Sequence, residues 1–433
     1  MRKFTFLFIM LILLLFSFSY AALEVNSPNI ALIDASNGRV LFERDAFIKT
    51  YPASTTKIMT AILTLENCKL DEGVLASENA INLVPSGGST ARIVAGETHT
   101  VEDLLKALLV ASANEAANIL AEHVAGDIDS FVDMMNKKAI EIGCKNTHFV
   151  NPNGLHDDNH YSCAYDIALM YKYAYTKLPT FKNFSSLTSF RLPTTSLYPE
   201  DDRTFKTSNK LLLTTKSNDG HLYFYEYCDG GKTGYTSQAK NCLVASATKS
   251  NVSLICCILG ATQSQDNLSY RFQDAINLFD YGFERVTRRI IIPSGDTVAT
   301  IPVENSKNSN DILEIGTMYE LIANVDSDFS KEEAISSITY SGDFEAPINE
   351  GDILGNATYT IYDETFTIPL VAKNSIEKRP AFTFLDFLSG LIIWSLRILI
   401  ILIILAIIRK ITNKNSKKQH LARVKRYNQR FRR

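Results

Sequence analysis

The stretch Tyr51-Pro52-Ala53-Ser54-Thr55-Thr56-Lys57-Ile58-Met59-Thr60 decides how this chain of 433 residues is interpreted. Apolar residues at positions 58, 61, 62 and 65 follow the proline at the spacing of one helical face, so a helix is predicted to begin here. Ser54 and Lys57 are three residues apart and fall on the same face of that helix. A buried amine that is partly neutral can accept the proton of a neighbouring hydroxyl. The stretch therefore offers a serine nucleophile with a potential base one turn away, and the N–H of Ser54 is placed to help hold an oxyanion.

The same Ser-x-x-Lys pattern occurs a second time, in Ser246-Ala247-Thr248-Lys249. This copy runs off the end of an apolar stretch typical of a β-strand. Residues three apart in a strand point to opposite faces, so this serine and lysine cannot meet. We therefore expect the first copy to be the functional one.

Ser112-Ala113-Asn114 supplies a second hydroxyl and a carboxamide. It lies at the break between an amphipathic helix over 101–109 and a further helix over 116–124. A hydroxyl there suits proton relay, and a carboxamide suits hydrogen bonding to a substrate amide. Ser77-Glu78-Asn79 and Ser306-Lys307-Asn308 have the same pattern but lack such a helix break, so we rank them lower.

Lys232-Thr233-Gly234 is predicted to begin a strand, immediately after a turn at Asp229-Gly230-Gly231. A cation and a hydroxyl on an exposed strand edge suit a carboxylate, and the glycine allows another backbone to approach closely. Lys206-Thr207-Ser208 is the rival triplet. It lies in a polar stretch from 178 to 218 that the sequence does not assign, and it has no glycine.

In this order, the three motifs resemble those of the penicillin-recognising serine enzymes. The segments 51–60, Asn151-Pro152-Asn153-Gly154-Leu155-His156, 231–236 and the later stretch from 346 to 370 resemble the D-alanyl-D-alanine carboxypeptidase branch, the low-molecular-mass penicillin-binding proteins. The resemblance implies removal of the terminal D-Ala from peptidoglycan stem pentapeptides through an acyl-serine, without a cofactor or metal, and acylation by β-lactam antibiotics. It implies the following site residues: Ser54 as nucleophile, Lys57 as base, Ser112 as proton relay, Asn114, Lys232, Thr233 and Gly234 as substrate-binding residues, and Tyr235, whose N–H would complete the oxyanion hole with that of Ser54.

The pattern of elements predicts an α+β fold, the antiparallel sheet flanked by helices of the β-lactamase and transpeptidase type. A hairpin over 31–43 opens it, helices follow, and strands over 222–227, 232–236, 243–247 and 252–259 precede a helix over 270–283. Short alternating runs then predict a small all-β domain. The expected segments are a catalytic domain at 22–284, the β domain at 285–376 and a linker at 377–386.

The two ends indicate export and anchoring. Residues 1–21 are typical of a secretory signal peptide, and 387–408 fits a transmembrane helix, although a helix lying on the membrane surface is an alternative. Residues 409–433 form a basic tail expected in the cytoplasm, which puts the catalytic domain outside the cell membrane. The formal net charge is −3, but the first 21 residues carry +2 and the tail +11, so the body carries about −16. Such acidity argues against nucleic acid as a partner.

Other functions were weighed against this one. Seven cysteines without a Cys-x-x-Cys pair indicate buried small side chains rather than zinc or a disulfide framework. His156-Asp157-Asp158-Asn159-His160 could hold zinc, but it lies in a loop and offers no His-Glu-x-x-His helix. A class A β-lactamase needs a glutamate that activates water, and no Glu-x-x-Leu-Asn occurs between 112 and 232. A non-catalytic peptidoglycan-binding module would not need all three motifs intact.

Overall fold

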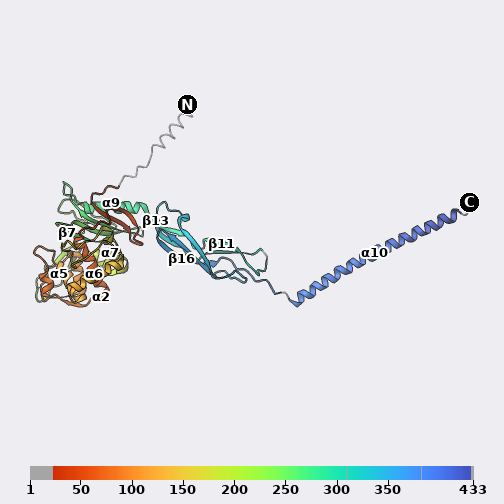
Figure 1. The fold of residues 1–433 in the computed structure, drawn as a ribbon, viewed down its shortest axis with the longest axis horizontal. Coiled ribbons are helices and arrows are strands. Elements are labelled where there is room, and N and C mark those ends of the chain that lie inside the picture. The colour runs from red at the N-terminus through yellow and green to blue at the C-terminus, as the bar shows by residue number, and fades with distance from the viewer. Residues whose placement is uncertain (1–22, 309, 382, 431–433) are drawn as a thin grey trace, which may run out of the picture. The chain divides into compact units, whose positions relative to one another are not determined.

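The computed structural model describes residues 23–308, 310–381 and 383–430, so the predicted signal peptide lies outside the described residues. The described chain divides into two compact units (Figure 1). The first unit contains the residues up to Ile292 together with Leu321–Ala334 and Ile361–Glu364, and the second contains Pro293–Glu320, Ile335–Thr360 and the residues from Thr365 onward. The domain boundaries drawn from the sequence stay predictions.

A five-stranded antiparallel sheet forms the centre of the first unit, in the order β2-β1-β9-β8-β7. Its strands are β1 (Asn29–Asp34), β2 (Val40–Arg44), β7 (Cys228–Thr236), β8 (Lys240–Lys249) and β9 (Val252–Ala261). The predicted hairpin is confirmed, because β1 and β2 pair through a turn at 35–39. β7, which carries Lys232-Thr233-Gly234, is an edge strand, and its outer edge is free of other strands in this sheet.

The sheet has apolar side chains on both faces. Along β1, Ala31 and Ile33 join one core cluster, and Ile30 and Leu32 join the other. This alternation follows from the two-residue period of a strand. α7 (Ala164–Lys177) packs on the first face and α9 (Tyr270–Arg285) on the second, and Figure 1 shows them on opposite sides of the strands. The predicted sheet flanked by helices is thus confirmed.

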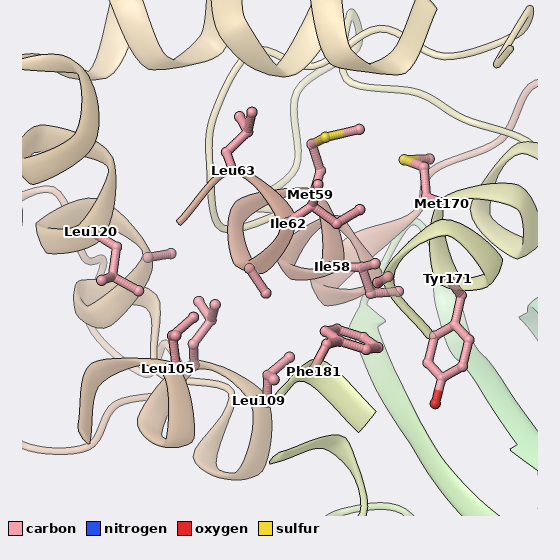
Figure 2. Close-up of a cluster of buried hydrophobic side chains, with 14 of the residues drawn as sticks. Ile58, Met59, Ile62, Leu63, Leu105, Leu109, Leu120, Met170, Tyr171 and Phe181 are labelled. Carbon is pink, nitrogen blue, oxygen red and sulfur yellow. The ribbon is translucent and has the colours of Figure 1, made fainter. Parts of the chain in front are cut away.

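The larger core is built around α2 (Lys57–Asn67), whose first eight residues are all buried. Figure 2 shows Ile58, Met59, Ile62 and Leu63 of this helix surrounded by apolar side chains of several other helices. A helix buried on every side is held by its surroundings, and this fixes the position of its first residue, Lys57. Its neighbours include α7, the π-helical turn η2 (Ala107–Ala111), which continues α4 (Val101–Lys106), and the helices α5 (Asn114–Ala125), α6 (Ile128–Ile142) and α8 (Pro179–Ser185).

The predicted strand over 222–227 and the turn at 229–231 are wrong. Residues 222–227 form no strand, and β7 runs from Cys228 straight through the glycines. A Cβ on Gly230 would lie 2.7 Å from both the Ser185 and the Tyr171 hydroxyl oxygens, and one on Gly231 would lie 2.8 Å from the carbonyl oxygen of Val244. The glycines therefore let β7 pack closely against α7, α8 and β8.

Short elements complete the first unit: η1 (Ala53–Thr56), β3 (Gly73–Leu75), α3 (Glu78–Asn82), β4 (Thr98–Thr100), β5 (Ser189–Arg191), β6 (Thr204–Lys206), η3 (Lys210–Leu212), β10 (Val286–Ile292), β13 (Leu321–Asp326) and η4 (Lys331–Glu333). β3 pairs with β4, β5 with β6, and β10 with β13. The stretch 178–218, which the sequence left unassigned, thus contains α8, one hairpin and η3, and the rest of it is irregular.

The second unit contains most of the predicted β domain and the long C-terminal helix, whereas β10, β13 and η4 of that predicted domain belong to the first unit. A second five-stranded sheet has the order β11-β12-β16-β15-β14. Its strands are β11 (Thr297–Pro302), β12 (Ile312–Thr317), β14 (Ile335–Tyr340), β15 (Ile353–Ile361) and β16 (Glu364–Ala372). α10 (Phe384–Arg430) contains the predicted span at 387–408 and is long and apolar enough to cross a membrane.

Candidate active site

Ser54 and Lys57 meet as the sequence predicted. Ser54 lies in η1, one turn before Lys57 opens α2, and Lys57 Nζ is 3.1 Å from Ser54 Oγ. The same Nζ donates to Asn114 Oδ1 at 2.7 Å and to the carbonyl oxygen of Asn153 at 2.6 Å. These three acceptors use every proton of an ammonium group. When the amine is neutral, its lone pair is free to accept the hydroxyl proton of Ser54.

The surroundings of Lys57 favour that neutral form. Its side chain is completely buried, and burial is the main cause that holds the pKa of the amine well below its usual value. The positive charge of Lys232 lowers this pKa further, while the negative charge of Glu115 opposes the shift. A lysine with a lowered pKa is the condition that the serine–lysine chemistry requires.

Ser112 and Asn114 are positioned by a sharp break in the helices. Helix α4 continues as the π-helical turn η2, which ends at Ser112 in a left-handed conformation, with φ 58° and ψ 31°. α5 begins two residues later, at Asn114, whose N–H donates to the carbonyl oxygen of Ser89. π-turns and non-glycine residues with positive φ are uncommon and concentrate at functional sites.

Lys232 and Thr233 lie in the middle of β7 rather than at its start. Lys232 is buried, and its Nζ donates to Ser112 Oγ at 2.9 Å and to the carbonyl oxygen of Thr233 at 2.8 Å. Burial, together with the charge of Arg271, lowers the pKa of Lys232 to about 7. The hydroxyl of Thr233 bonds to that of Ser208. There are thus two hydrogen-bonded lysine–serine pairs, Lys57 with Ser54 and Lys232 with Ser112, and the charge of Lys232 lowers the pKa of Lys57.

Two glycines let backbone segments close around Ser54. A Cβ on Gly234 would lie 2.9 Å from the backbone nitrogen of Ser54, so the edge of β7 passes directly by that N–H. A Cβ on Gly154, which has φ +83°, would lie 2.0 Å from the carbonyl oxygen of Ala53. Gly234 was expected to let a substrate backbone approach closely. In the structure, the backbone at Ser54 already lies close to it. Tyr235, the next residue, has a largely exposed side chain.

A cavity of about 500 Å³ opens over these groups. Six of the eight predicted site residues line it, and Lys57 and Lys232 lie beneath it through their hydrogen bonds. The other lining residues are Pro85, Ser86, Gly87, Gly88, Ser89, Val110, Ala111, Gly154, Leu155, Lys206, Ser208, Thr236 and Arg271. A cleft of this size suits a short peptide or a small molecule.

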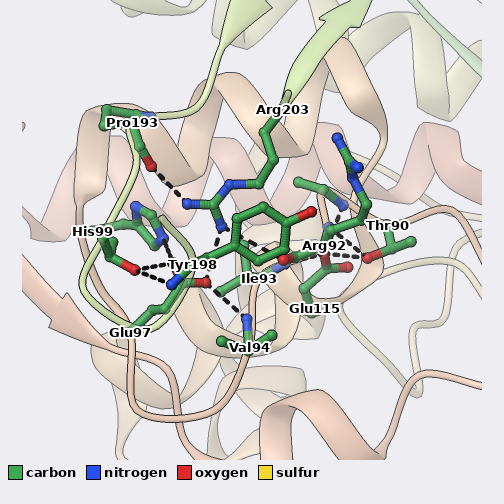
Figure 3. Close-up of polar contacts among 12 residues, drawn as sticks. Thr90, Arg92, Ile93, Val94, Glu97, His99, Glu115, Pro193, Tyr198 and Arg203 are labelled. Carbon is green, nitrogen blue, oxygen red and sulfur yellow. Dashed lines mark hydrogen bonds and ion pairs between the residues drawn. The ribbon is translucent and has the colours of Figure 1, made fainter. Parts of the chain in front are cut away.

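Buried charges hold one wall of the cavity (Figure 3). Arg203 donates to Glu97 at 2.9 Å, and both side chains are completely buried. Glu115 accepts from the hydroxyl of Thr90 and from the N–H of Ala91, each at 2.6 Å. Glu115 thereby fixes the segment that follows the pocket residues 85–89.

Sequence reasoning missed four contributors to the site. The carbonyl of Asn153 could have been found only through the Asn-Pro-Asn-Gly stretch. Ser208 and Lys206 belong to the triplet that was set aside as a rival, yet both line the cavity. Arg271, on α9, also lines it and donates to the carbonyl oxygen of Gly234 at 3.3 Å.

The competing motifs lie elsewhere or have structural roles. Ser246 is buried in β8 and donates to Asp229 at 2.6 Å, while Lys249 is exposed at the end of the strand. His160 is buried with both ring nitrogens engaged, Nδ1 by the N–H of Val150 and Nε2 by the hydroxyl of Thr56. All seven cysteines are free thiols, and five of them are buried.

The comparisons with known proteins agree with this geometry. The family model Peptidase_S11, D-alanyl-D-alanine carboxypeptidase, matches residues 17–263. The chain belongs to this family. It is therefore a serine-type peptidase of a penicillin-binding family that acts on peptidoglycan.

Individual relatives extend the likeness beyond the matched region. The enzyme is 33% identical over 365 residues to the D-alanyl-D-alanine carboxypeptidase DacF of Bacillus subtilis, covering 83% of this chain and 88% of that protein. DacA of Escherichia coli is 27% identical over 362 residues, covering 82% and 84%. The structure of PBP3 from Streptococcus pneumoniae, titled a peptidoglycan synthesis regulatory factor, matches with a TM-score of 0.63 at 26% identity, covering 82% of this chain and 100% of that one.

Proposed function

We propose that this enzyme removes the terminal D-Ala from peptidoglycan stem pentapeptides, with Ser54 as the nucleophile. Neutral Lys57 takes the hydroxyl proton as Ser54 Oγ attacks the carbonyl carbon between the last two D-Ala residues. The observation that carries this proposal is the 3.1 Å contact between Ser54 Oγ and a completely buried amine whose pKa is held low.

The charge that develops on the substrate oxygen needs donors close to Ser54. The N–H of Ser54 and that of Tyr235 are our candidates, because β7 passes by the Ser54 nitrogen at Gly234. The tetrahedral intermediate collapses as the C–N bond breaks. Ser112, which Lys232 Nζ contacts at 2.9 Å, passes its proton to the leaving amine of D-Ala and regains one from protonated Lys57, which becomes neutral again.

The free carboxylate at the end of the substrate is bound by cations and a hydroxyl of the site. Lys232 supplies a positive charge and Thr233 a hydroxyl, and Lys206 adds a second cation at the cavity. Asn114 donates a hydrogen bond to the substrate through its side-chain NH2 group, because its side-chain oxygen already accepts from Lys57. Water then attacks the acyl-serine, and the peptide is released one residue shorter with Ser54 restored. β-Lactams acylate the same oxygen.

The experiment compares the wild-type chain with Ser54→Ala and with Ser246→Ala, the serine of the second Ser-x-x-Lys copy. We expect wild type and Ser246→Ala to take up one β-lactam and to release D-Ala from a pentapeptide, and Ser54→Ala to do neither. Intact-mass spectrometry measures the adduct, and a D-amino-acid assay measures the release. Labelling of Ser54→Ala would show that another residue is the nucleophile, and rapid turnover of the β-lactam would favour a lactamase.

The proposal includes the location of this enzyme in the cell. A cleaved signal peptide at 1–21 and a span at 387–408 would hold the catalytic domain outside the cell membrane, with the tail inside. Protease added to intact cells should then digest the catalytic domain and spare an epitope in the tail.

A further inference from the structure

Three metal-ligating side chains of different chemistry meet on the first unit, away from the active-site cavity. They are Cys68, Glu72 and His123, whose ligand atoms all lie within 4.8 Å of one another. No other such group of three occurs in the part of the chain that the structure describes. His123 Nε2 is 3.1 Å from Glu72 Oε2.

The backbone around these side chains is already ordered. Glu72 Oε1 accepts the N–H of Lys69 at 2.8 Å, which leaves Oε2 directed toward His123. The carbonyl oxygen of Glu72 accepts the N–H of Val101 at 2.9 Å, so the loop is tied to the start of α4. All three side chains are partly buried, which gives an ion access from solvent. A prearranged set of ligands lowers the ordering cost of binding.

The ends of two helices meet at this point. Cys68 caps the C-terminus of α2, and His123 lies in the last turn of α5. The carbonyl ends of helices carry partial negative charge and attract cations. This is an electrostatic preference for a cation that is independent of the three ligand atoms themselves.

We propose that Cys68, Glu72 and His123 bind a zinc ion. A thiolate, an imidazole and a carboxylate are all zinc ligands, whereas calcium and magnesium prefer oxygen alone. The thiolate and the carboxylate balance the charge of the ion. Water completes a tetrahedral site, because a fourth protein ligand is absent from this group among the described residues.

The ion acts on the fold rather than on the reaction. α2 begins at Lys57 and α5 at Asn114, so the ligands sit at the far ends of the two helices that carry these active-site residues. Eleven residues of α-helix span about 16 Å, which is too far for the ion to touch a substrate at Ser54. Zinc therefore clamps the two helices together at the ends opposite the active site.

The test measures metal binding to the full chain purified in detergent after treatment with a chelator. Equilibrium dialysis with zinc alone should give one ion per chain. Cobalt in place of zinc should produce a sulfur-to-metal charge-transfer band and the visible bands of a four-coordinate ion. At a free zinc concentration of 100 times Kd, the ratio of folded to unfolded protein should rise about 100-fold, seen as a higher melting temperature.

Variants decide whether these residues are the ligands. Cys68→Ser should abolish the charge-transfer band, and Cys68→Ser, Glu72→Gln and His123→Ala should each weaken zinc binding by at least about tenfold. Cys228→Ser and His420→Ala, which replace a partly buried thiol and an exposed imidazole elsewhere, should bind as wild type does. Calcium should bring no stabilisation.

The proposal is overturned if the wild type binds no zinc, or if the cobalt spectrum shows no sulfur ligand. It is overturned equally if the three variants bind as wild type does. Acylation of wild type by a β-lactam should stay within twofold with and without zinc, and a larger change would refute the clamp as a purely structural site.

Discussion

Replacing Gly154 by alanine tests the idea that the loop around Asn153 holds the base. The new Cβ would lie 2.0 Å from the carbonyl oxygen of Ala53 and 3.0 Å from the backbone nitrogen of Ser54. Both contacts are with backbone atoms, so no side-chain rotation relieves them. Gly154 follows Asn153, whose carbonyl oxygen accepts from Lys57 Nζ at 2.6 Å. A shift of this loop therefore moves an acceptor of the Lys57 amine, the proposed base.

The size of the effect follows from these distances. Two terms lower stability: about 1–2 kcal/mol for an alanine held at positive φ, and about 1–3 kcal/mol for overpacking. The loop or η1 must yield by more than about 1 Å for the new Cβ to reach an ordinary contact distance. A displacement of that size near reacting groups costs about 100-fold in rate. We thus expect a folded but less stable enzyme whose acylation is about 100-fold slower.

The matched control is Gly126→Ala, at the end of α5. Gly126 has φ +88°, close to the +83° of Gly154, but a Cβ there meets nothing within 4 Å. It therefore places an alanine at a similar positive φ without the clash. The second-order rate of acylation by a fluorescent penicillin and the melting temperature are measured for both variants. Acylation rates that differ by less than threefold would refute the assigned role of the loop.

The other predictions concern buried charge. Burial lowers the pKa of Lys232 from 10.5 to about 7, so between these pH values the folded state has lost a proton that the unfolded state keeps, and stability rises with pH. Lys232→Met should therefore stabilise the fold by roughly 3–5 kcal/mol below pH 7 and by little near pH 10, and it should lose activity. Melting curves recorded across this pH range measure the effect. Glu115→Gln removes a negative charge that raises the pKa of Lys57, so the acid limb of the acylation profile should move to lower pH. Arg203→Met leaves Glu97 buried without its cation and should cost about 3–5 kcal/mol, measured by denaturant unfolding.

The Glu115 and Arg203 variants each have a matched control on the same chain. Glu122→Gln, on the same helix as Glu115 but bonded to Ser77 and Asn79, should leave the pH profile in place. Arg92→Met breaks a pair with Asp202 that is exposed to solvent and should cost less than about 1 kcal/mol. A pH profile unchanged in Glu115→Gln, equal losses for the two arginine variants, or a pH-independent effect of Lys232→Met would each contradict the corresponding argument.

The sequence predicted the main elements because their signals are local. The short continuous apolar runs of β1 and β9 and the helical spacing of apolar residues in α2 and α9 can be recognised within each segment alone. Where packing overrides local preference, the prediction failed. Asp229-Gly230-Gly231 has the composition of a turn, but these glycines are needed because α7, α8 and β8 leave no room for a Cβ on β7.

By itself, the sequence determined the identity and order of the three motifs, and the strand predicted around Ser246 is confirmed as part of β8. Only the tertiary structure decided how they act together. The carbonyl of Asn153 could not be inferred from side-chain identity, because every residue has one. The low pKa of Lys57 depends on its complete burial and on Lys232, which is 175 positions away in the sequence. The meeting of Cys68, Glu72 and His123 depends in the same way on how α2 packs against α5, since no single stretch of sequence contains all three.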